Sequence, residues 1–250
     1  MALIEMKFWS AALQMQTAAT IIVPQTAPPF SVMYLLHGLS DNHSAWQRRT
    51  RIETYLGDLP LMVVMPDGGR GFYCDAHIGM KWESALIHDL IPFIDATFQT
   101  RAEPGGRCIG GLSMGGYGAA KLALKFPELF ASAVSHSGAL AFAHEFFPDE
   151  VKMDDPFRLE LERIAGPNPQ GGPNDCFALA EKLKDSRPAL RVDCGTEDYL
   201  LASNRNFHAH LETIGYAHEY EEFPGAHNWD YWDLHIREAI AFHARNLGLA

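Results

Sequence analysis

Residues 107–124 read RCIGGLSMGGYGAAKLAL, an apolar run followed by a glycine-rich turn and a stretch of helical composition. RCIG is typical of a short buried strand, and MGGYGAAKLAL is typical of a helix. Between them lies Gly-Leu-Ser-Met-Gly at 111–115, a G-x-S-x-G motif. A serine at a sharp strand-to-helix turn is exposed and can be activated as a nucleophile by a nearby base. The motif therefore predicts Ser113 as a nucleophile, with an ordinary glycine-rich turn as the alternative.

Short β-rich runs alternate with helical patterns on both sides of this motif. Val32–Leu36 (VMYLL) and Leu61–Met65 (LMVVM) are continuous apolar runs typical of central parallel strands. Residues 4–23 have the pattern of an opening pair of strands, and apolar residues four apart predict a helix over 81–98 with a bend at Pro92. Further strands are expected at 107–109, 131–134, 190–194 and 219–223, and further helices at 113–126, 203–214 and 232–246. The alternation predicts an α/β fold with a mostly parallel central sheet flanked by helices.

The size of the chain favours a single domain. It has 250 residues, of which 47% are hydrophobic, enough to bury one substantial core. The alternation of strands and helices breaks at about 139–188, where NPQGGPND and several acidic residues occur. We expect this segment to be a cap-like insertion over the C-terminal edge of the sheet. The prediction is one domain over residues 1–250.

An activated serine needs a histidine base, and the chain contains 12 histidines. His227 follows the predicted strand EYEEF through Pro-Gly-Ala and precedes the last predicted helix. In that position its ring can reach over the sheet edge toward Ser113, so His227 is the predicted base. His136 ends the strand after the nucleophile helix, where a structural role is favoured over a place in the site.

The remaining candidate histidines fall inside predicted helices. His235 and His243 lie in the last helix, where a solvated or packed side chain is the ordinary interpretation. His208 and His210 are two residues apart on another helix, so they do not share a face. We therefore expect no metal pair from these two residues.

The carboxylate that orients the histidine is expected in a loop after another late strand. LRVDCG followed by TEDYL supplies such a loop, and Asp198 is the preferred residue. Asp193, within the strand, and Glu197, beside Asp198, remain alternatives on chemistry alone. Whichever it is, the carboxylate accepts the imidazole N–H, fixes the tautomer and stabilises the imidazolium.

The oxyanion of an acyl-transfer reaction needs two backbone N–H donors, one from the residue after the nucleophile and one from a loop after an early strand. Met114 is the residue after the predicted nucleophile. Leu39 lies in the run His-Gly-Leu that directly follows VMYLL, and Gly38 allows a close approach of the backbone. Met114 and Leu39 are therefore the predicted donors.

Charge and composition exclude several classes of partner. The chain has 20 basic and 31 acidic residues, a net charge of -11, which disfavours nucleic acid and anionic membrane surfaces. No apolar stretch is long enough for a membrane span, and residues 1–16 lack the apolar core of a secretory signal, so we expect a cytoplasmic protein. The four cysteines form no C-x-x-C pair, which favours reduced thiols. No metal or organic cofactor is expected.

Six stretches, in this order, resemble the esterase D-like family of α/β-hydrolases: YLLHGLSDNHSAW, VVMPDG, KWESALIHDLIPFI, GGLSMGGYGA, CGTEDYL and FPGAHNWDYW. The resemblance covers most of the chain and is closest to the tributyrin-esterase-like carboxylesterases. It implies the α/β-hydrolase fold, with Ser113 as nucleophile, His227 as base, Asp198 rather than Glu197 as acid, and Leu39 and Met114 as oxyanion donors.

The function that this resemblance implies is a serine carboxylesterase acting on small-molecule esters with short acyl chains. Alternatives on the same triad are a feruloyl or acetylxylan esterase, an S-formylglutathione hydrolase and an acyltransferase, and a different class is a binding protein on a hydrolase scaffold. The chain departs from the S-formylglutathione hydrolase pattern after Pro66 and around His227. Five phenylalanines of the insertion could form a slot for a hydroxycinnamoyl group: Phe142, Phe146, Phe147, Phe157 and Phe177. The oligomeric state stays open, and a homo-oligomer is compatible with the sequence.

Overall fold

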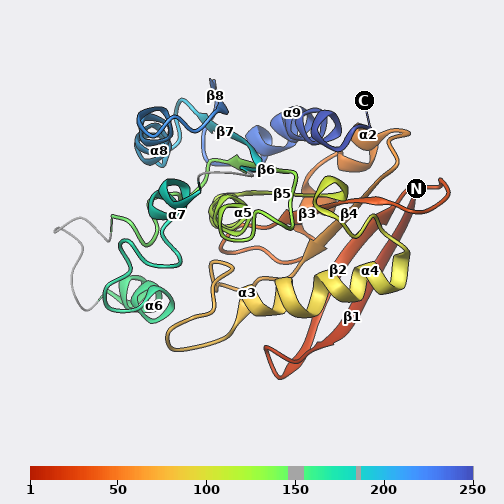
Figure 1. The fold of residues 1–250 in the computed structure, drawn as a ribbon, viewed down its shortest axis with the longest axis horizontal. Helices are drawn as coiled ribbons and strands as arrows, with labels where there is room; N and C mark the ends of the chain where they lie inside the picture. Colours follow the sequence, from red (N-terminus) through yellow and green to blue (C-terminus); the bar gives the residue numbers. More distant parts are fainter. Residues whose placement is uncertain (146–154, 184–186, 250) are drawn as a thin grey trace.

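One eight-stranded sheet runs through the part of the chain that the computed structural model describes, residues 1–145, 155–183 and 187–249. Its order is β1-β2-β4-β3-β5-β6-β7-β8 (Figure 1). The strands are β1 (Ala2–Ser10), β2 (Met15–Val23), β3 (Ser31–Leu36), β4 (Leu61–Pro66), β5 (Arg107–Leu112), β6 (Ser132–His136), β7 (Ala189–Gly195) and β8 (His218–Phe223). Every strand expected from the sequence is present, with ends shifted by a few residues.

The sheet is parallel from β4 through β3, β5, β6 and β7 to β8, and antiparallel only where β1 pairs with β2 and β2 with β4. The predicted mostly parallel sheet is thereby confirmed. In a parallel sheet all strands end at the same edge, so the loops after β3, β5, β7 and β8 come together there.

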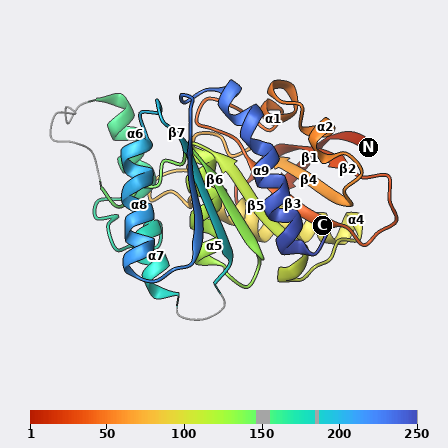
Figure 2. The same cartoon turned by 90° about the horizontal axis from the view of Figure 1, so that it is seen from above.

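Helices cover both faces of the sheet (Figure 2). Along β3, Val32, Tyr34 and Leu36 belong to one hydrophobic cluster and Met33 and Leu35 to the other, because successive side chains of a strand point to opposite faces. The first cluster includes side chains of η1 (Ala85–Leu90), α4 (Ile91–Phe98), α5 (Met114–Lys125), α6 (Pro156–Ala165), α7 (Cys176–Lys182) and α8 (Leu201–Thr213). The second includes side chains of α1 (Ala45–Arg49), α2 (Ile52–Leu56) and α9 (Trp229–Leu247).

The helix predicted over 81–98 is present but not uniform. It begins as α3 (Trp82–Ser84), continues as the π-helical segment η1 and ends as α4. Pro92 lies in the first turn of α4 and has no N–H to donate to the carbonyl of His88. The wider π turn just before Pro92 accommodates that missing hydrogen bond.

The segment 139–188 connects β6 to β7, its neighbour in the sheet. Its residues 146–154 and 184–186, including Phe146 and Phe147, lie outside the described residues. The described remainder contains α6 and α7, two helices that the sequence analysis did not predict, and each begins at an aspartate whose carboxylate accepts backbone N–H groups of the first turn. No helix among the described residues is both long and apolar enough to cross a membrane.

Candidate active site

Ser113 lies at the sharp turn between β5 and α5. Its backbone has φ 54° and ψ -116°, a strained conformation, and its N–H donates to the His136 carbonyl at 2.9 Å. Glycine is required on both sides of the turn, because a Cβ on Gly111 would lie 2.5 Å from the Gly115 oxygen and one on Gly115 2.5 Å from the Leu36 oxygen. The turn therefore holds the Ser113 hydroxyl at the C-terminal edge of the sheet.

His227 lies in the loop after β8 and bridges Ser113 to Asp198. Its Nε2 is 2.9 Å from Ser113 Oγ, and its Nδ1 is 2.8 Å from Asp198 Oδ2. Since Nδ1 faces a carboxylate it carries the proton, which leaves the Nε2 lone pair directed at the serine hydroxyl. The structure thus brings together the three residues that the sequence analysis selected, in the geometry needed to activate the serine.

Asp198 is held as a carboxylate by its surroundings. Burial raises the pKa of the Asp198 carboxyl, but hydrogen bonds from His227 and from the Leu200 N–H outweigh that effect, so the pKa lies below its ordinary value. The side chain is fully buried, and that of His227 is 13% exposed. A charged acceptor therefore faces the histidine at neutral pH.

The two alternative carboxylates lie elsewhere. Glu197 is exposed, and its carboxylate accepts from the Thr196 hydroxyl. Asp193 lies inside the sheet, where its Oδ1 is 2.9 Å from His136 Nδ1 and accepts from Tyr231 at 3.0 Å. His136 is fully buried and, as expected, makes a structural contact rather than facing the cavity beside Ser113.

The acid and base loops support each other through their backbones. The Thr196 N–H donates to the Phe223 carbonyl at 2.8 Å, and the Glu197 N–H donates to the Gly225 carbonyl at 2.9 Å. A Cβ on Gly195 would lie 2.2 Å from the Gly225 oxygen, so only glycine allows this approach. The contact fixes the position of Asp198 relative to His227.

Leu39 and Met114 line the same cavity as Ser113, as their predicted role requires. The Leu39 loop is fixed by His37, whose Nε2 accepts from the Gly68 N–H at 2.9 Å. The other ring nitrogen, Nδ1, therefore carries the proton and donates to the Gly38 carbonyl at 2.7 Å.

Tyr73 completes this network around the His37 backbone. Its hydroxyl accepts from the His37 N–H at 2.9 Å and donates to the His37 carbonyl at 3.2 Å. Burial raises the pKa of Tyr73 well above its ordinary value, so the hydroxyl stays protonated. From sequence, Tyr73 is expected either to pack in the core or to line the cleft, and the support it gives to the His37 backbone is not predicted; for His37, its place beside Gly38 is the available signal.

A cavity of about 290 Å³ opens beside Ser113, with a mainly apolar wall. Phe72 and Phe142 stack on each other with ring centroids 4.3 Å apart, and Phe157 and Leu161 of α6 complete the wall. Two phenylalanines of the insertion, Phe142 and Phe157, are thus at the site. Phe177 instead stacks on His144 away from this cavity.

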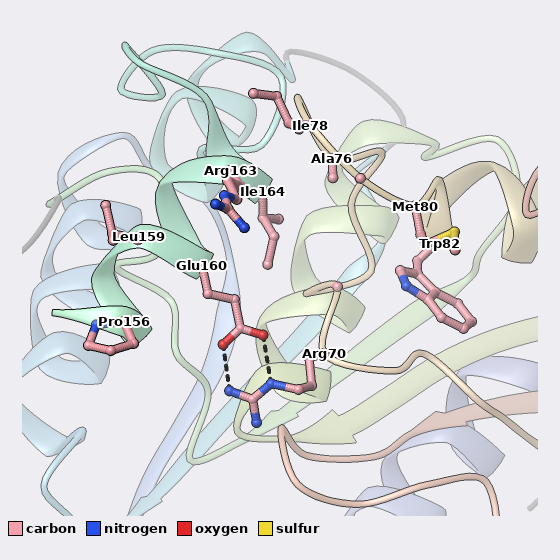
Figure 3. A pocket seen from close by; sticks show the side chains of 12 residues that line it. Arg70, Ala76, Ile78, Met80, Trp82, Pro156, Leu159, Glu160, Arg163 and Ile164 are labelled. Carbon is pink, nitrogen blue, oxygen red and sulfur yellow. Dashed lines mark hydrogen bonds and ion pairs between the residues drawn. The ribbon is translucent and has the colours of Figure 1, made fainter. Parts of the chain in front are cut away.

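A second cavity, of about 390 Å³, is also bordered by α6 (Figure 3). Trp82 and Ile164 contribute to its wall, and Arg70 donates two hydrogen bonds of 2.6 Å to the Glu160 carboxylate (Figure 3). This ion pair ties α6 to the loop that precedes α3. Helix α6 therefore contributes side chains to both cavities.

Comparisons with known proteins relate the chain to esterases. The model of a family described as "Putative esterase" matches residues 10–243. An acetyl esterase of Caldicellulosiruptor saccharolyticus is 29% identical over 96% of this chain and 97% of its own length. The fluorophosphonate-binding serine hydrolase F of Staphylococcus aureus superposes with a TM-score of 0.85 at 27% identity, covering 97% of this chain and 98% of that one. An S-formylglutathione hydrolase of the same organism gives 0.82 at 28% identity, with the same coverage.

Proposed function

The chain belongs to the esterase family whose model spans residues 10–243 and has the α/β-hydrolase fold, which makes it a carboxylic ester hydrolase, and we propose that it cleaves short-chain acyl esters through Ser113, His227 and Asp198. The observation that carries the proposal is the unbroken line of hydrogen bonds from Ser113 Oγ through the His227 ring to Asp198. We propose further that residues 1–250 act as one domain on small-molecule esters.

In the first half of the reaction, His227 Nε2 takes the Ser113 proton while Oγ attacks the ester carbonyl carbon. The tetrahedral oxyanion is held by the backbone N–H groups of Leu39 and Met114, and Asp198 stabilises the imidazolium. The imidazolium then donates its proton to the leaving alkoxide oxygen. Alcohol departs, and the acyl group remains on Ser113.

In the second half, water replaces the alcohol. His227 removes one proton from it, the oxygen attacks the acyl-enzyme carbonyl, and the same two N–H groups hold the second oxyanion. Collapse of this intermediate returns the proton to Ser113 and releases the carboxylic acid. The steps require no metal ion or organic cofactor.

The size of the cavity supports a short acyl group. Its volume of about 290 Å³ is at the lower end of small-molecule sites, which span roughly 300–1,000 Å³. Each buried methylene stabilises a complex by up to ~0.8 kcal/mol only while there is wall to bury it against. The rings of Phe142 and Phe157 form part of the wall of this small cavity. Acetyl to butyryl groups are therefore the expected substrates.

The aromatic wall favours one second candidate, an esterase for hydroxycinnamoyl groups. Phe72 and Phe142 stack on each other and both line the cavity, so an aromatic acyl group bound there meets aromatic rings. Such a substrate would gain from ring contacts that a butyryl group cannot make.

A panel of esters tests the acyl preference. We expect kcat/KM for p-nitrophenyl esters to be highest between acetyl and butyryl and to fall for chains of eight or more carbons. A maximum at octanoate or longer would contradict the short-acyl proposal. Methyl ferulate cleaved faster than p-nitrophenyl acetate, after allowing for its poorer leaving group, would promote the second candidate. S-Formylglutathione and an added acceptor alcohol test thioester hydrolysis and acyl transfer.

A matched pair of variants tests the wall itself. Phe157, 43% exposed, lines the cavity, whereas Phe93, 41% exposed, stacks on Phe8 on the far side of the molecule from it. Phe157→Ala should lengthen the preferred acyl chain by about two carbons, and Phe93→Ala should leave it unchanged. Equal profiles for the two variants would show that α6 does not limit the acyl group.

A further inference from the structure

Helix α8 and the edge strand β8 bring three metal-binding side chains together outside the active site. His208 and Glu212 lie one turn apart on α8, and His218 is the first residue of β8. Their ligand atoms all lie within 4.8 Å of one another. This is the single group of three or more histidine, cysteine and acidic residues so arranged in the described parts of the chain. None of the three takes part in the proposed ester cleavage.

The two rings face each other through nitrogens that compete for one proton. His208 Nδ1 is 2.8 Å from His218 Nε2, while His218 Nδ1 lies 2.7 Å from the Tyr216 carbonyl. Because a carbonyl only accepts, His218 Nδ1 carries the proton, and its Nε2 presents a lone pair toward His208. Without a cation, His208 must place its own proton between the rings. A metal ion can replace that proton and accept both lone pairs.

The surroundings hold both rings in the orientation that metal binding requires. The Tyr216 carbonyl fixes the tautomer and the direction of His218, as a hydrogen-bond acceptor at the far ring nitrogen commonly does for a histidine that binds a metal. The His208 ring stacks on Tyr220, with centroids 4.1 Å apart and planes 6° from parallel. Both imidazoles are thus positioned before any ion arrives, which lowers the entropic cost of binding.

The ligand set selects the class of ion. Two neutral imidazoles and one carboxylate suit Zn²⁺ and similar divalent transition metals, whereas Ca²⁺ and Mg²⁺ prefer oxygen ligands. Ligands at the usual zinc distances lie about 3.3 Å apart in a tetrahedron, so the two ring nitrogens need to separate by only about 0.5 Å. Glu212 is exposed and free to swing toward the ion, and water completes the coordination.

We propose that His208, Glu212 and His218 bind one divalent transition-metal ion, of which Zn²⁺ is the model, and that the ion ties α8 to β8. These two elements carry the site loops at their other ends. Helix α8 begins just after Asp198, and β8 ends just before the loop of His227. The ion therefore has a structural role. It joins the two elements that carry the loops of Asp198 and His227, and it lies away from the reacting atoms.

Calorimetric titration of the full-length protein with Zn²⁺ alone tests the site. We expect one equivalent to bind with a dissociation constant below about 100 µM. His218→Gln and Glu212→Gln should each weaken binding at least tenfold. His88→Gln, which changes an exposed histidine outside the cluster, should not. Circular dichroism confirms that each variant is folded.

Zinc can also bind at the active-site histidine, so His227→Ala is needed as a second comparison. The proposal requires that His227→Ala still binds one equivalent as tightly as the unaltered chain. It also requires Zn²⁺ at one hundred times its dissociation constant to shift the unfolding equilibrium by about 100-fold, and this shift to disappear in His218→Gln. Binding that is weaker than about 100 µM, or that is lost in His227→Ala and kept in His218→Gln, overturns it.

Discussion

Two of the histidine–aspartate pairs among the described residues, His136–Asp193 and His227–Asp198, have nearly the same contact distance and lie on neighbouring parts of the sheet. His136 on β6 and Asp193 on β7 are partners in the strand register, with Nδ1 and Oδ1 2.9 Å apart. His227 and Asp198 lie in the loops just beyond β8 and β7, with Nδ1 and Oδ2 2.8 Å apart. The first pair is fully buried, whereas in the second the His227 side chain is 13% exposed and faces the Ser113 hydroxyl.

The difference lies at the second ring nitrogen. His227 Nε2 faces the Ser113 hydroxyl, while His136 Nε2 is buried with no hydrogen-bond partner among the described residues. The carboxylate can orient either ring, but only a ring in a loop beyond the sheet edge meets a nucleophile and a substrate. The His136–Asp193 pair is therefore a structural contact within the sheet. The His227–Asp198 pair, in the loops beyond the sheet edge, contains the candidate catalytic base.

The largest expected effect separates the two histidines by activity. Ser113→Ala and His227→Ala should each lower ester kcat by roughly a million-fold, because members of a triad act as a unit. His136→Gln should change kcat by less than about tenfold, since it touches no reacting atom. Steady-state kinetics on p-nitrophenyl acetate measures all three. Full activity in His227→Ala would contradict the assignment of His227 as the base.

The second largest effect should separate the two aspartates by their influence on kcat. Asp198→Asn should cost on the order of 10⁴ in kcat, because an amide cannot hold the histidine in the required tautomer. Asp193→Asn, in the buried pair, should affect kcat far less than it affects stability. Glu197→Gln is the matched control in the acid loop and should be nearly silent. A larger loss for Glu197→Gln than for Asp198→Asn would move the acid by one position.

Substitution in the buried His136–Asp193 pair should lower the unfolding free energy more than substitution of His227. His136→Gln leaves the Asp193 carboxylate buried without its histidine and should lower the unfolding free energy by roughly 3 kcal/mol. His227→Ala removes a ring that is 13% exposed, so it should lower the unfolding free energy by less. Urea denaturation followed by circular dichroism compares them. Equal losses would mean that His136 does not support the sheet.

The pH dependence of activity should be smaller but specific. Hydrogen bonds hold the pKa of Asp198 below its ordinary value despite burial, so this carboxylate stays ionised through the neutral range. Only neutral imidazole accepts the serine proton, so kcat/KM should rise with pH, at most tenfold per unit, from the acidic into the neutral range. Activity that rises as pH falls through this range would contradict a histidine base.

The same pKa shift makes a prediction for stability. A carboxyl whose pKa is lower in the folded state stabilises the fold at pH values above its unfolded pKa of about 3.9. That contribution is lost as pH falls through the folded pKa of Asp198. Acid unfolding of Asp198→Asn should therefore be less steep below about pH 4 than that of the unaltered chain.

The sheet and the triad were accessible from sequence because both follow local rules. Apolar runs such as 61–65 predict buried parallel strands, and the order of strands sends the loops of Ser113, Asp198 and His227 to one edge. The G-x-S-x-G motif predicts a strained turn at its serine, and Ser113 has a positive φ of 54°. Chain order and a place in the loop after a late strand selected His227, the histidine that lies 2.9 Å from Ser113 Oγ.

The features that were missed depend on contacts between distant segments. Helices α6 and α7 are short and begin at aspartates within a segment rich in proline and glycine, which masks their apolar faces. His208 was judged only against His210 on the same helix, whereas its partner His218 comes from a strand. His37 gains its role from Gly68 and Tyr73, about 30 residues away or more. No local pattern contains these contacts.

The most direct test of the account is labelling with a fluorophosphonate, which reacts only with an activated serine, followed by peptide mass mapping. The account predicts one adduct, on Ser113, with a labelling rate that falls by at least about a thousand-fold in His227→Ala and stays within about threefold in His136→Gln. An adduct on another residue, or labelling of His227→Ala at the rate of the unaltered chain, would contradict it.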